Sequence, residues 1–495
     1  MITKLTAIAT VSVALLGFSG AHADVPFQPI ADLGFGASVY DVNAAGSIVG
    51  IVRTSNGLNV PAVWSSATAT PTALPTDGRG GFASAINSNG EVVGQTFSAS
   101  GSGGTPTVWR GGVRVQLPDL GGGGDARDIG ESGEIVGYVY GDGGALRAAR
   151  WVNDVLEVLP LPAFGNPGDS VWSSAESINS SGIITGTVRV AWDSTGQAGS
   201  DSQAIRWDNG AVRACTSQGL ETKGLSVDNL GNILLNGYFS ATGGPAVARA
   251  NGTLVQLPLI GTSYVVRATA MSRSGIVCGY YLSSDPTTGR PLWKGAAWSN
   301  GTATTAATAL ELPTGMAWAF PWGVGNNGIV IGEVSDGVSG IAIPGYWALD
   351  LAPAMLTASD ASGARGQVIE LTATSMRGTA KNVGHSVSVT VNGIAAGQAV
   401  TNTNGVAKIA FTIPANVSGS QLSVRFRDES GAIANKQITV SGGCATGDLN
   451  CDGAVNGTDL GLLMSQWGSS GSADLNGDGV VNGTDLGRLI GEWRN

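Results

Sequence analysis

The stretch Ala85-Ile86-Asn87-Ser88-Asn89-Gly90-Glu91-Val92-Val93-Gly94 decides the fold of the first 350 residues. It reads as an apolar strand, an Asn-x-x-Gly turn and a second apolar strand, and versions of it recur along the chain. Successive copies are 43 to 53 residues apart. Self-similarity at such a period is the signature of a repeat architecture. The central glycines of the copies lie at positions 46, 90, 133, 182, 231, 275 and 328.

Two further strands follow the hairpin in most repeats, one ending in Trp and the next in Leu-Pro. Four short strands in each repeat are the content of one β-propeller blade. The fifth copy, residues 247–250, has no Trp. Because the Trp residues recur at one place in each blade, they predict an inter-blade core and not a sugar-binding platform. The set comprises Trp64, Trp109, Trp151, Trp207, Trp298 and Trp347.

The seventh repeat stops after Trp347 and lacks its fourth strand, whereas residues 27–33 look like one isolated copy of that strand. We expect the N-terminal strand to complete the last blade, because closing the ring removes open sheet edges. The sequence therefore predicts a mainly β protein whose residues 24–350 form a seven-bladed β-propeller.

The repeat region resembles a known family. On the pattern Ile86-Asn87-x-x-Gly90 and the later Val-Trp strand, residues 27–347 are similar to the HAF repeats of extracellular bacterial proteins. The third strand carries Val-Trp or Arg-Trp where that family often has Ala-Phe-x-Trp. The resemblance implies a secreted repeat protein and no defined activity.

The N-terminus predicts export. Residues 1–23 contain Lys4, an apolar run over residues 5–18 and a small-x-small site at Ala21-His22-Ala23, which together indicate a secretory signal peptide. An apolar run of about 14 residues is too short to span a membrane. We therefore expect an extracellular or cell-surface protein without a membrane span.

Charge and cysteine content narrow the interpretation further. The net charge of −10 argues against a nucleic-acid partner, because there is no excess of basic side chains to neutralise phosphates. In an oxidising compartment, Cys444 and Cys451 are close enough in sequence to be a candidate disulfide. Cys215 and Cys278 fall on strands of different repeats, so we interpret them as buried thiols.

After residue 353 the repeat gives way to alternating Val, Thr and Ser runs separated by the turn pairs Asn392-Gly393 and Asn404-Gly405. About seven short strands in residues 354–441 predict a β-sandwich. Residues 401–407, followed by a strand, resemble the bacterial immunoglobulin-like domains of surface proteins. The resemblance implies an Ig-like spacer.

The last 50 residues contain two copies, 26 residues apart, of a loop rich in Asp and Asn. Calcium prefers about six to eight oxygen ligands, which a loop of about 12 residues supplies from positions 1, 3, 5, 7, 9 and 12, with Gly at position 6. Both copies carry side-chain oxygens at 1, 3, 5, 9 and 12, so we expect two Ca²⁺ ions. The ligands predicted are Asp448, Asn450, Asp452, Ala454 (backbone carbonyl), Asn456 and Asp459, then Asp474, Asn476, Asp478, Val480 (backbone carbonyl), Asn482 and Asp485.

Position 12 is Asp in both loops, and a short helix with an i, i+3, i+4, i+7 apolar pattern follows each. These features resemble the dockerin type I family over residues 447–493. The resemblance implies folding around calcium and docking onto a cohesin module; a generic calcium-stabilised cell-surface anchor is the alternative. Carried onto this chain, the recognition candidates are Gly457, Thr458, Gly483, Thr484, Gln466 and Arg488.

Signals for catalysis are few. The two histidines are His22, in the signal peptide, and His385, in the spacer, so no His-based triad is expected in the ring. We favour a secreted, non-catalytic binding or scaffold protein with no catalytic residues. The alternative is a polysaccharide-degrading enzyme, an O-glycosyl hydrolase that uses paired carboxylates of the ring. Its candidate residues are Asp41, Asp125, Asp128 and Glu134.

Overall fold

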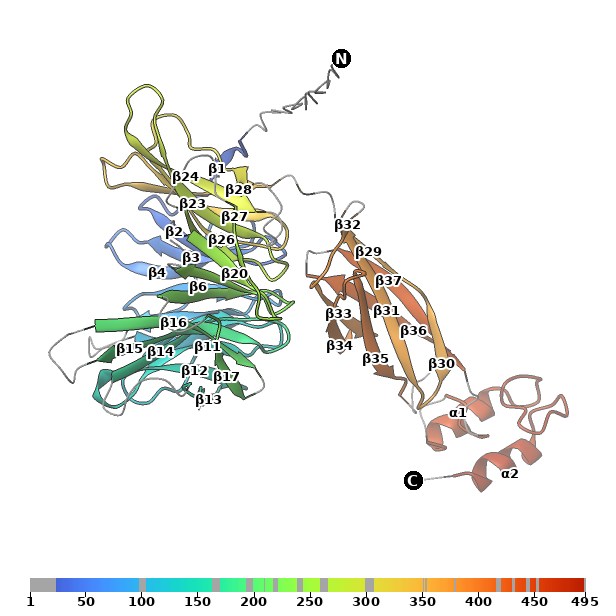
Figure 1. Ribbon diagram of the computed structural model, residues 1–495. Coiled ribbons are helices and arrows are strands. Elements are labelled where there is room, and N and C mark those ends of the chain that lie inside the picture. The colour runs from blue at the N-terminus through green and yellow to red at the C-terminus, as the bar shows by residue number, and fades with distance from the viewer. Residues whose placement is uncertain are drawn as a thin grey trace, which may run out of the picture.

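The computed structural model describes residues 24–493, apart from 98–103, 163–169, 193–198, 209, 217–220, 238–243, 259–265, 299–306, 350, 352–353, 378–379, 415–419, 430–431, 442–445 and 451–453. The predicted signal peptide and the candidate disulfide between Cys444 and Cys451 lie outside these residues. The chain runs through three regions, which we call the ring (24–349), the sandwich (354–441) and the tail (446–493) (Figure 1).

Each of the first five repeats of the ring forms one antiparallel four-stranded sheet, with its strands in sequence order. A short 3₁₀ turn, Asp142–Gly144, interrupts the third repeat. The strands are β2 Ala37–Val42, β3 Ile48–Arg53, β4 Asn59–Trp64, β5 Thr72–Ala73; β6 Gly81–Ile86, β7 Val92–Phe97, β8 Gly104–Arg110, β9 Val113–Gln116; β10 Gly124–Ile129, β11 Ile135–Tyr140, β12 Leu146–Val152, β13 Val155–Val158; β14 Ser170–Ile178, β15 Ile184–Trp192, β16 Gly199–Asp208, β17 Ala211–Ala214; β18 Thr222–Val227, β19 Ile233–Gly237, β20 Gly244–Ala248, β21 Leu254–Gln256.

The last two repeats are joined into one eight-stranded sheet by a single parallel bridge between Trp293 and Trp318. The N-terminal strand β1 pairs antiparallel with β28, and Phe27 lies opposite Trp347. The expected completion of the last repeat by the N-terminus is therefore confirmed. The strands are β22 Val266–Met271, β23 Val277–Ser284, β24 Pro291–Trp298, β25 Thr308–Ala309, β26 Trp318–Val324, β27 Ile329–Ser335, β28 Ala342–Ala348 and β1 Phe27–Pro29.

The sheets of successive repeats pack against one another, and β2 of the first repeat packs against β26 and β27 of the last. The fold of the ring is therefore propeller-like. All six repeat Trp side chains are buried, with exposed fractions of 3% or less. The indole N–H of Trp109 donates to the Pro75 carbonyl of the preceding repeat at 2.8 Å, and Trp151 makes the equivalent bond to Pro118. The predicted inter-blade role of these residues is confirmed.

The Asn-x-x-Gly turn explains why the repeat needs its glycines. Gly90 has φ of +79°, a backbone conformation that residues with a side chain rarely adopt. Gly94 lies opposite a β-bulge in β6, where a Cβ would collide with the Phe82 carbonyl. The spacing of the glycines in the sequence therefore records a turn in each repeat, and a bulge in every repeat except the fifth, where Leu235 lies opposite the bulge.

The sandwich consists of nine described strands in two sheets that share one apolar core. The sequence predicted about seven; the short strands β30 and β32 show no alternating pattern that would have revealed them. One sheet contains β29 Ala354–Ala358, β31 Val368–Arg377, β32 Ala380–Lys381 and β35 Val406–Thr412. The other contains β30 Ala361–Ala364, β33 Ser386–Val391, β34 Ile394–Val400, β36 Gln421–Asp428 and β37 Ile433–Ser441.

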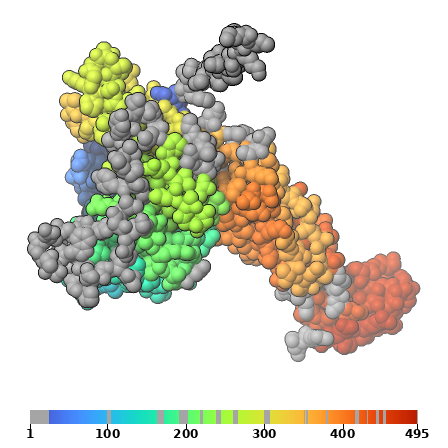
Figure 2. All heavy atoms as spheres, in the orientation of Figure 1, coloured from blue at the N-terminus to red at the C-terminus, as the bar shows by residue number. Residues whose placement is uncertain are grey.

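The sandwich lies against the face of the ring that carries the Asn-x-x-Gly turns (Figures 1 and 2). The side-chain Nδ2 of Asn229 donates to the Glu429 carboxylate at 3.0 Å, and the Arg377 guanidinium donates to the Asn326 carbonyl at 2.9 Å. Leu230 packs over Gly384. The sandwich, which the sequence predicted to be a spacer, therefore also contacts the ring directly.

The tail contains two helices, α1 Gly457–Ser465 and α2 Gly483–Gly491. Its core consists of five buried side chains, Val455, Leu463, Ala473, Val481 and Leu489. Within the described part of the chain, no helix is long and apolar enough to cross a membrane.

Candidate functional site

The ninth residue of each predicted calcium loop caps a tail helix, which begins at the next residue. Asn482 caps α2, because its side chain accepts from the Thr484 amide at 2.8 Å while Asp485 accepts from the Asn482 amide at 2.8 Å. Asn456 and Asp459 make the same reciprocal bonds at the start of α1. This capping box satisfies backbone donors that a helix otherwise leaves unpaired. The Asn at position 9 and the Asp at position 12 therefore fix the end of each loop to its helix.

The second loop is described throughout and curls around its first residue. The Asp474 carboxylate accepts from the backbone amides of Gly477, Asp478 and Gly479. Gly479, at position 6, has φ of +90°, as the sharp turn of such a loop requires. In the first loop, Asp452 lies outside the described residues.

Position 12 lies beside position 1 in the second loop. The buried Asp485 carboxylate accepts from the amides of Leu475 and Asn476, the two residues that follow Asp474. Burial alone would raise the pKa of Asp485. The backbone donors outweigh it, so that the pKa lies below its ordinary value and the group is ionised at neutral pH.

The donor set suits a hard cation. It consists of carboxylate, amide and backbone oxygens, and its two end positions are held next to each other. Among the described residues, no three Asp, Glu, His or Cys side chains converge closely enough to form a ready-made metal site. The ligation by individual residues therefore stays a prediction.

The helices expose more apolar surface than the sequence pattern indicated. Leu463 and Leu489 are buried as expected. Met464 is 52% exposed, and its counterpart 26 residues later, Ile490, is 56% exposed. Trp467 and Trp493 are likewise exposed at 46% and 39%. A core of five side chains is too small to cover these positions.

The predicted recognition residues divide into two groups. The first group is exposed at the helix starts and consists of Gly457, Thr458, Gly483 and Thr484. Arg488, in the second half of α2, is also exposed. Gln466 is half-buried, and its side-chain oxygen accepts from the Ala473 amide at 3.2 Å. Expecting it on the open surface was wrong, because it ties the end of α1 to the segment between the loops.

In the ring, Asp41 and Asp128 line a cavity of ≈ 190 Å³ at the centre, formed by the innermost strands. Each carboxylate bridges two repeats. Asp41 accepts from the amides of Val42 and Ile86, and Asp128 accepts from those of Ile129 and Ile178. Their oxygens are therefore engaged in holding adjacent sheets together.

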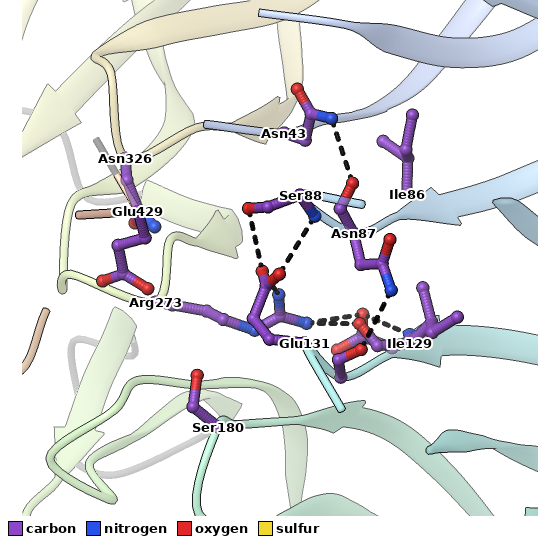
Figure 3. Close-up of polar contacts among 12 residues, drawn as sticks. Asn43, Ile86, Asn87, Ser88, Ile129, Glu131, Ser180, Arg273, Asn326 and Glu429 are labelled. Atoms are coloured by element: carbon purple, nitrogen blue, oxygen red, sulfur yellow. Dashed lines mark hydrogen bonds and ion pairs between the residues drawn. The ribbon is translucent and has the colours of Figure 1, made fainter. Parts of the chain in front are cut away.

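Burial, reinforced by the Asp128 carboxylate, raises the pKa of Asp41 to about 6, although the two amides and Arg273 oppose the shift. Arg273 contacts Asp128 at 3.1 Å and Glu131 at 3.2 Å (Figure 3). The other candidates are also paired: Glu134 with Arg150 at 2.9 Å, and the buried Asp125 with Arg127 at 2.9 Å.

Glu131 closes the cavity toward the sandwich. It accepts from the amide and hydroxyl of Ser88, while Glu429 reaches the same region from the sandwich (Figure 3). Burial, reinforced by Asp428 and Glu131, raises the pKa of Glu429 well above its ordinary value, although Arg273 opposes the shift. This contact between regions was not predicted, because nothing in the local sequence of residue 429 indicates its distant neighbours.

Sequence reasoning also missed the bridging role of the turn asparagines. Asn87 caps its own turn through Oδ1, which accepts from the amides of Asn89 and Glu91. Its Nδ2 donates to the Gly130 carbonyl in the next repeat at 3.2 Å. Asn43 and Asn179 make equivalent bonds. The recurrence of Asn before the glycine was the available signal.

The tail is thus a paired-loop, two-helix domain of the calcium-binding type. Residues 446–492 match the family model described as "Dockerin type I domain", and this segment of the chain is a dockerin type I domain. A search of curated proteins gives no match.

Several solved structures are similar to part of the chain. A virginiamycin B lyase from Staphylococcus aureus is 12% identical, covering 65% of this chain and 99% of its own, with a TM-score of 0.38. TolB from Acinetobacter baumannii is 9% identical, covering 81% and 68%, with a TM-score of 0.31. A GH74 xyloglucanase from Xanthomonas campestris is 12% identical, covering 82% and 67%, with a TM-score of 0.32. At TM-scores this low, the likenesses carry no argument about function.

Proposed function

We propose that the chain is an exported modular protein whose tail binds two Ca²⁺ ions and docks onto a cohesin, and whose ring is a non-catalytic binding or scaffold propeller with seven blades. The observation that carries the proposal is the dockerin-type tail, in which both helices start from an Asx loop closed by a buried Asp. The sandwich would be an Ig-like domain that holds the tail away from the ring.

Each ion would be held by the oxygens of one loop. In the second loop these come from Asp474, Asn476, Asp478, Asn482 and Asp485, together with the Val480 carbonyl. Asp485 is already ionised and fixed against the loop start, so calcium would replace backbone donors as its partner with little movement of the helix. Bound calcium would neutralise the negative charge of the loop carboxylates. Its binding energy would thereby stabilise the folded tail, whose buried apolar core is small.

The docking surface would combine the helix starts with the exposed apolar side chains. Thr458 and Met464 on α1 correspond to Thr484 and Ile490 on α2, 26 residues later. A surface that repeats in this way permits a cohesin to bind in either of two orientations. The exposed Trp467 and Trp493 would supply aromatic contacts of the kind common at the centres of interfaces.

The ring carboxylates favour the non-catalytic proposal over the glycosyl hydrolase alternative. A retaining or inverting enzyme needs two carboxyl groups that reach the substrate. Asp41 and Asp128 are bonded to backbone amides between repeats. The pKa of Asp125 is raised to about 7 by burial despite Arg127, which suits a general acid, but this side chain is only 1% exposed.

Capture of the full chain on an immobilised type I cohesin tests the proposal. We expect binding in calcium, loss on adding a chelator, and loss in calcium for the double variant Asp459→Ala/Asp485→Ala. Asp285→Ala, in an exposed turn of the ring, is the matched control and should bind normally. Calcium-independent capture would contradict the proposal, and so would turnover in a polysaccharide hydrolysis assay of the same preparation.

A further inference from the structure

Five aromatic side chains form a continuous surface where the last two repeats meet. Trp318, Phe320 and Trp322 alternate along β26 and so point to the same side of the strand. The ring centroids of Trp318 and Phe320 are 5.8 Å apart, as are those of Phe320 and Trp322. Tyr280 of β23 and Trp293 of β24 extend the row, with Tyr280 4.8 Å from Phe320 and 5.5 Å from Trp293. We call these five residues the aromatic patch.

The patch is not part of the core of the ring. Trp318 and Trp322 are each 38% exposed, whereas the six repeat Trp side chains are at most 3% exposed. The core Trp residues also have their indole N–H bonded to the backbone of the preceding repeat. Large aromatic side chains gathered on an open surface indicate a binding function, since burial would have been favourable.

The patch begins at the end of β26 that is farther along the chain from the sandwich contact. It extends from Trp318, the first residue of the strand, to Trp322, the fifth, whereas the turn after the strand contacts Arg377 of the sandwich through Asn326. Trp172 has the corresponding place in the fourth repeat, four residues before the unpaired bulge residue Glu176, as Trp318 is four before the unpaired Trp322. Trp172 lines a hollow of ≈ 580 Å³ together with polar side chains such as Ser202 and Glu221.

The charge beside the patch points to a neutral ligand. Glu333, on the neighbouring strand β27, interacts with the side chains of Ser38 and Trp322. Burial raises its pKa, although those two hydrogen bonds oppose the shift. Arg267 lies directly opposite Tyr280 on the neighbouring strand, so that no single sign of charge dominates beside the patch. The net charge of −10 also disfavours acidic polysaccharides and nucleic acids as ligands.

We propose that the aromatic patch binds a neutral polysaccharide chain, with successive sugar rings stacked on Trp318, Phe320 and Trp322. The C–H faces of a pyranose carry partial positive charge and fit the negative face of an aromatic ring. The 5.8 Å spacing of the patch is similar to the length of one sugar unit. The proposal rests on the proposed role of the ring as a binding domain and names its ligand class.

Affinity electrophoresis of the calcium-loaded full chain tests this inference, with hydroxyethylcellulose, barley mixed-linkage β-glucan or polygalacturonate in the gel. We expect retardation by at least one neutral polymer and none by polygalacturonate. The double variant Trp318→Ala/Trp322→Ala should bind about tenfold more weakly, since it loses two stacking contacts. Phe97→Ala, at an equally exposed aromatic residue of the second repeat outside the patch, is the matched control and should bind like the wild type.

The conservative double variant Trp318→Phe/Trp322→Phe keeps aromatic faces and should retain part of the binding, which separates stacking from misfolding. Equal migration of wild type and double alanine variant in every neutral gel would overturn the inference, as would a preference for polygalacturonate. Self-association in sedimentation that the alanine variant abolishes would also overturn it, because the patch would then bind a second copy. Cohesin capture of the same variants reports on the tail separately.

Discussion

The ring turns and the tail loops are built from the same residue types, Asn or Asp followed by Gly, and they use those side chains differently. In the ring, Asn87 caps its own turn and bonds the next repeat, and buried Trp side chains lie between the sheets. In the tail, Asp474 and Asp485 also accept from backbone amides, but among the described residues only five apolar side chains are fully buried, with four partly buried leucines packed against them. The comparison indicates that packing of buried apolar side chains is enough to stabilise the Asx turns of the ring. The Asx loops of the tail have little such packing, and we expect a bound cation to stabilise them instead.

Removing calcium should give the largest effect, and it should be confined to the tail. We expect hydrogen–deuterium exchange of residues 446–493 to accelerate by on the order of tenfold or more on chelation, because the binding energy of such loops is also folding energy. Peptides covering residues 85–97 should exchange at the same rate with and without calcium. A tail that stays equally protected after chelation would break the comparison.

Substituting a ring turn should give an intermediate effect. Asn87→Asp keeps the turn cap but loses the donor to Gly130 and sets a carboxylate beside Glu91, which now accepts from Asn87 at 2.7 Å. We expect a loss of about 1 to 3 kcal/mol in the free energy of unfolding. Urea denaturation measures it, and Asn56→Asp, in an exposed turn, is the control that should change little.

The fifth repeat suggests a second substitution that should restore part of the stability lost in Asn87→Asp. There the turn residue is Asp228, and Asn232 four residues later donates to it at 2.7 Å. The double variant Asn87→Asp/Glu91→Asn copies this pair and should recover part of the lost stability. No recovery would show that the bond to the next repeat, and not the local charge, dominates.

The smallest effect concerns the contact between ring and sandwich. The pKa of Glu429 is raised, so the folded chain holds this proton more tightly than the unfolded chain. The contribution of Glu429 to the stability of the folded chain is therefore fully present below the unfolded pKa of about 4.3. It is lost as the pH rises through the folded pKa. At about pH 7.5, Glu429→Gln should increase the free energy of unfolding by on the order of 1 kcal/mol and so raise Tm. At about pH 4 it should leave Tm nearly unchanged.

Calorimetry at the two pH values tests this. Glu370→Gln, which removes an exposed ion pair with Lys408, is the matched control in the sandwich and should show no such pH dependence. Destabilisation by Glu429→Gln at both pH values would mean that the charged form is favoured at the interface, contrary to the buried environment of the group.

The sequence by itself determined what repeats. The period of the Asn-x-x-Gly turns, the position of the repeat Trp residues and the isolated strand at residues 27–33 predicted the sheets, their packing and the pairing of β1 with β28. The two 12-residue loops predicted the dockerin type I domain at residues 446–492. These features are local, because each depends on turn geometry or strand alternation within one repeat or loop.

Only the tertiary structure decided what lies between repeats and between regions. It showed that Asp41 and Asp128 join sheets, that Glu429 of the sandwich reaches the ring and that the half-buried Gln466 bonds to the segment between the two loops. It also separated the buried Trp109 from the exposed Trp318 and Trp322. The physical reason is that burial and the partners of a polar atom depend on residues distant in the chain, which no local pattern records.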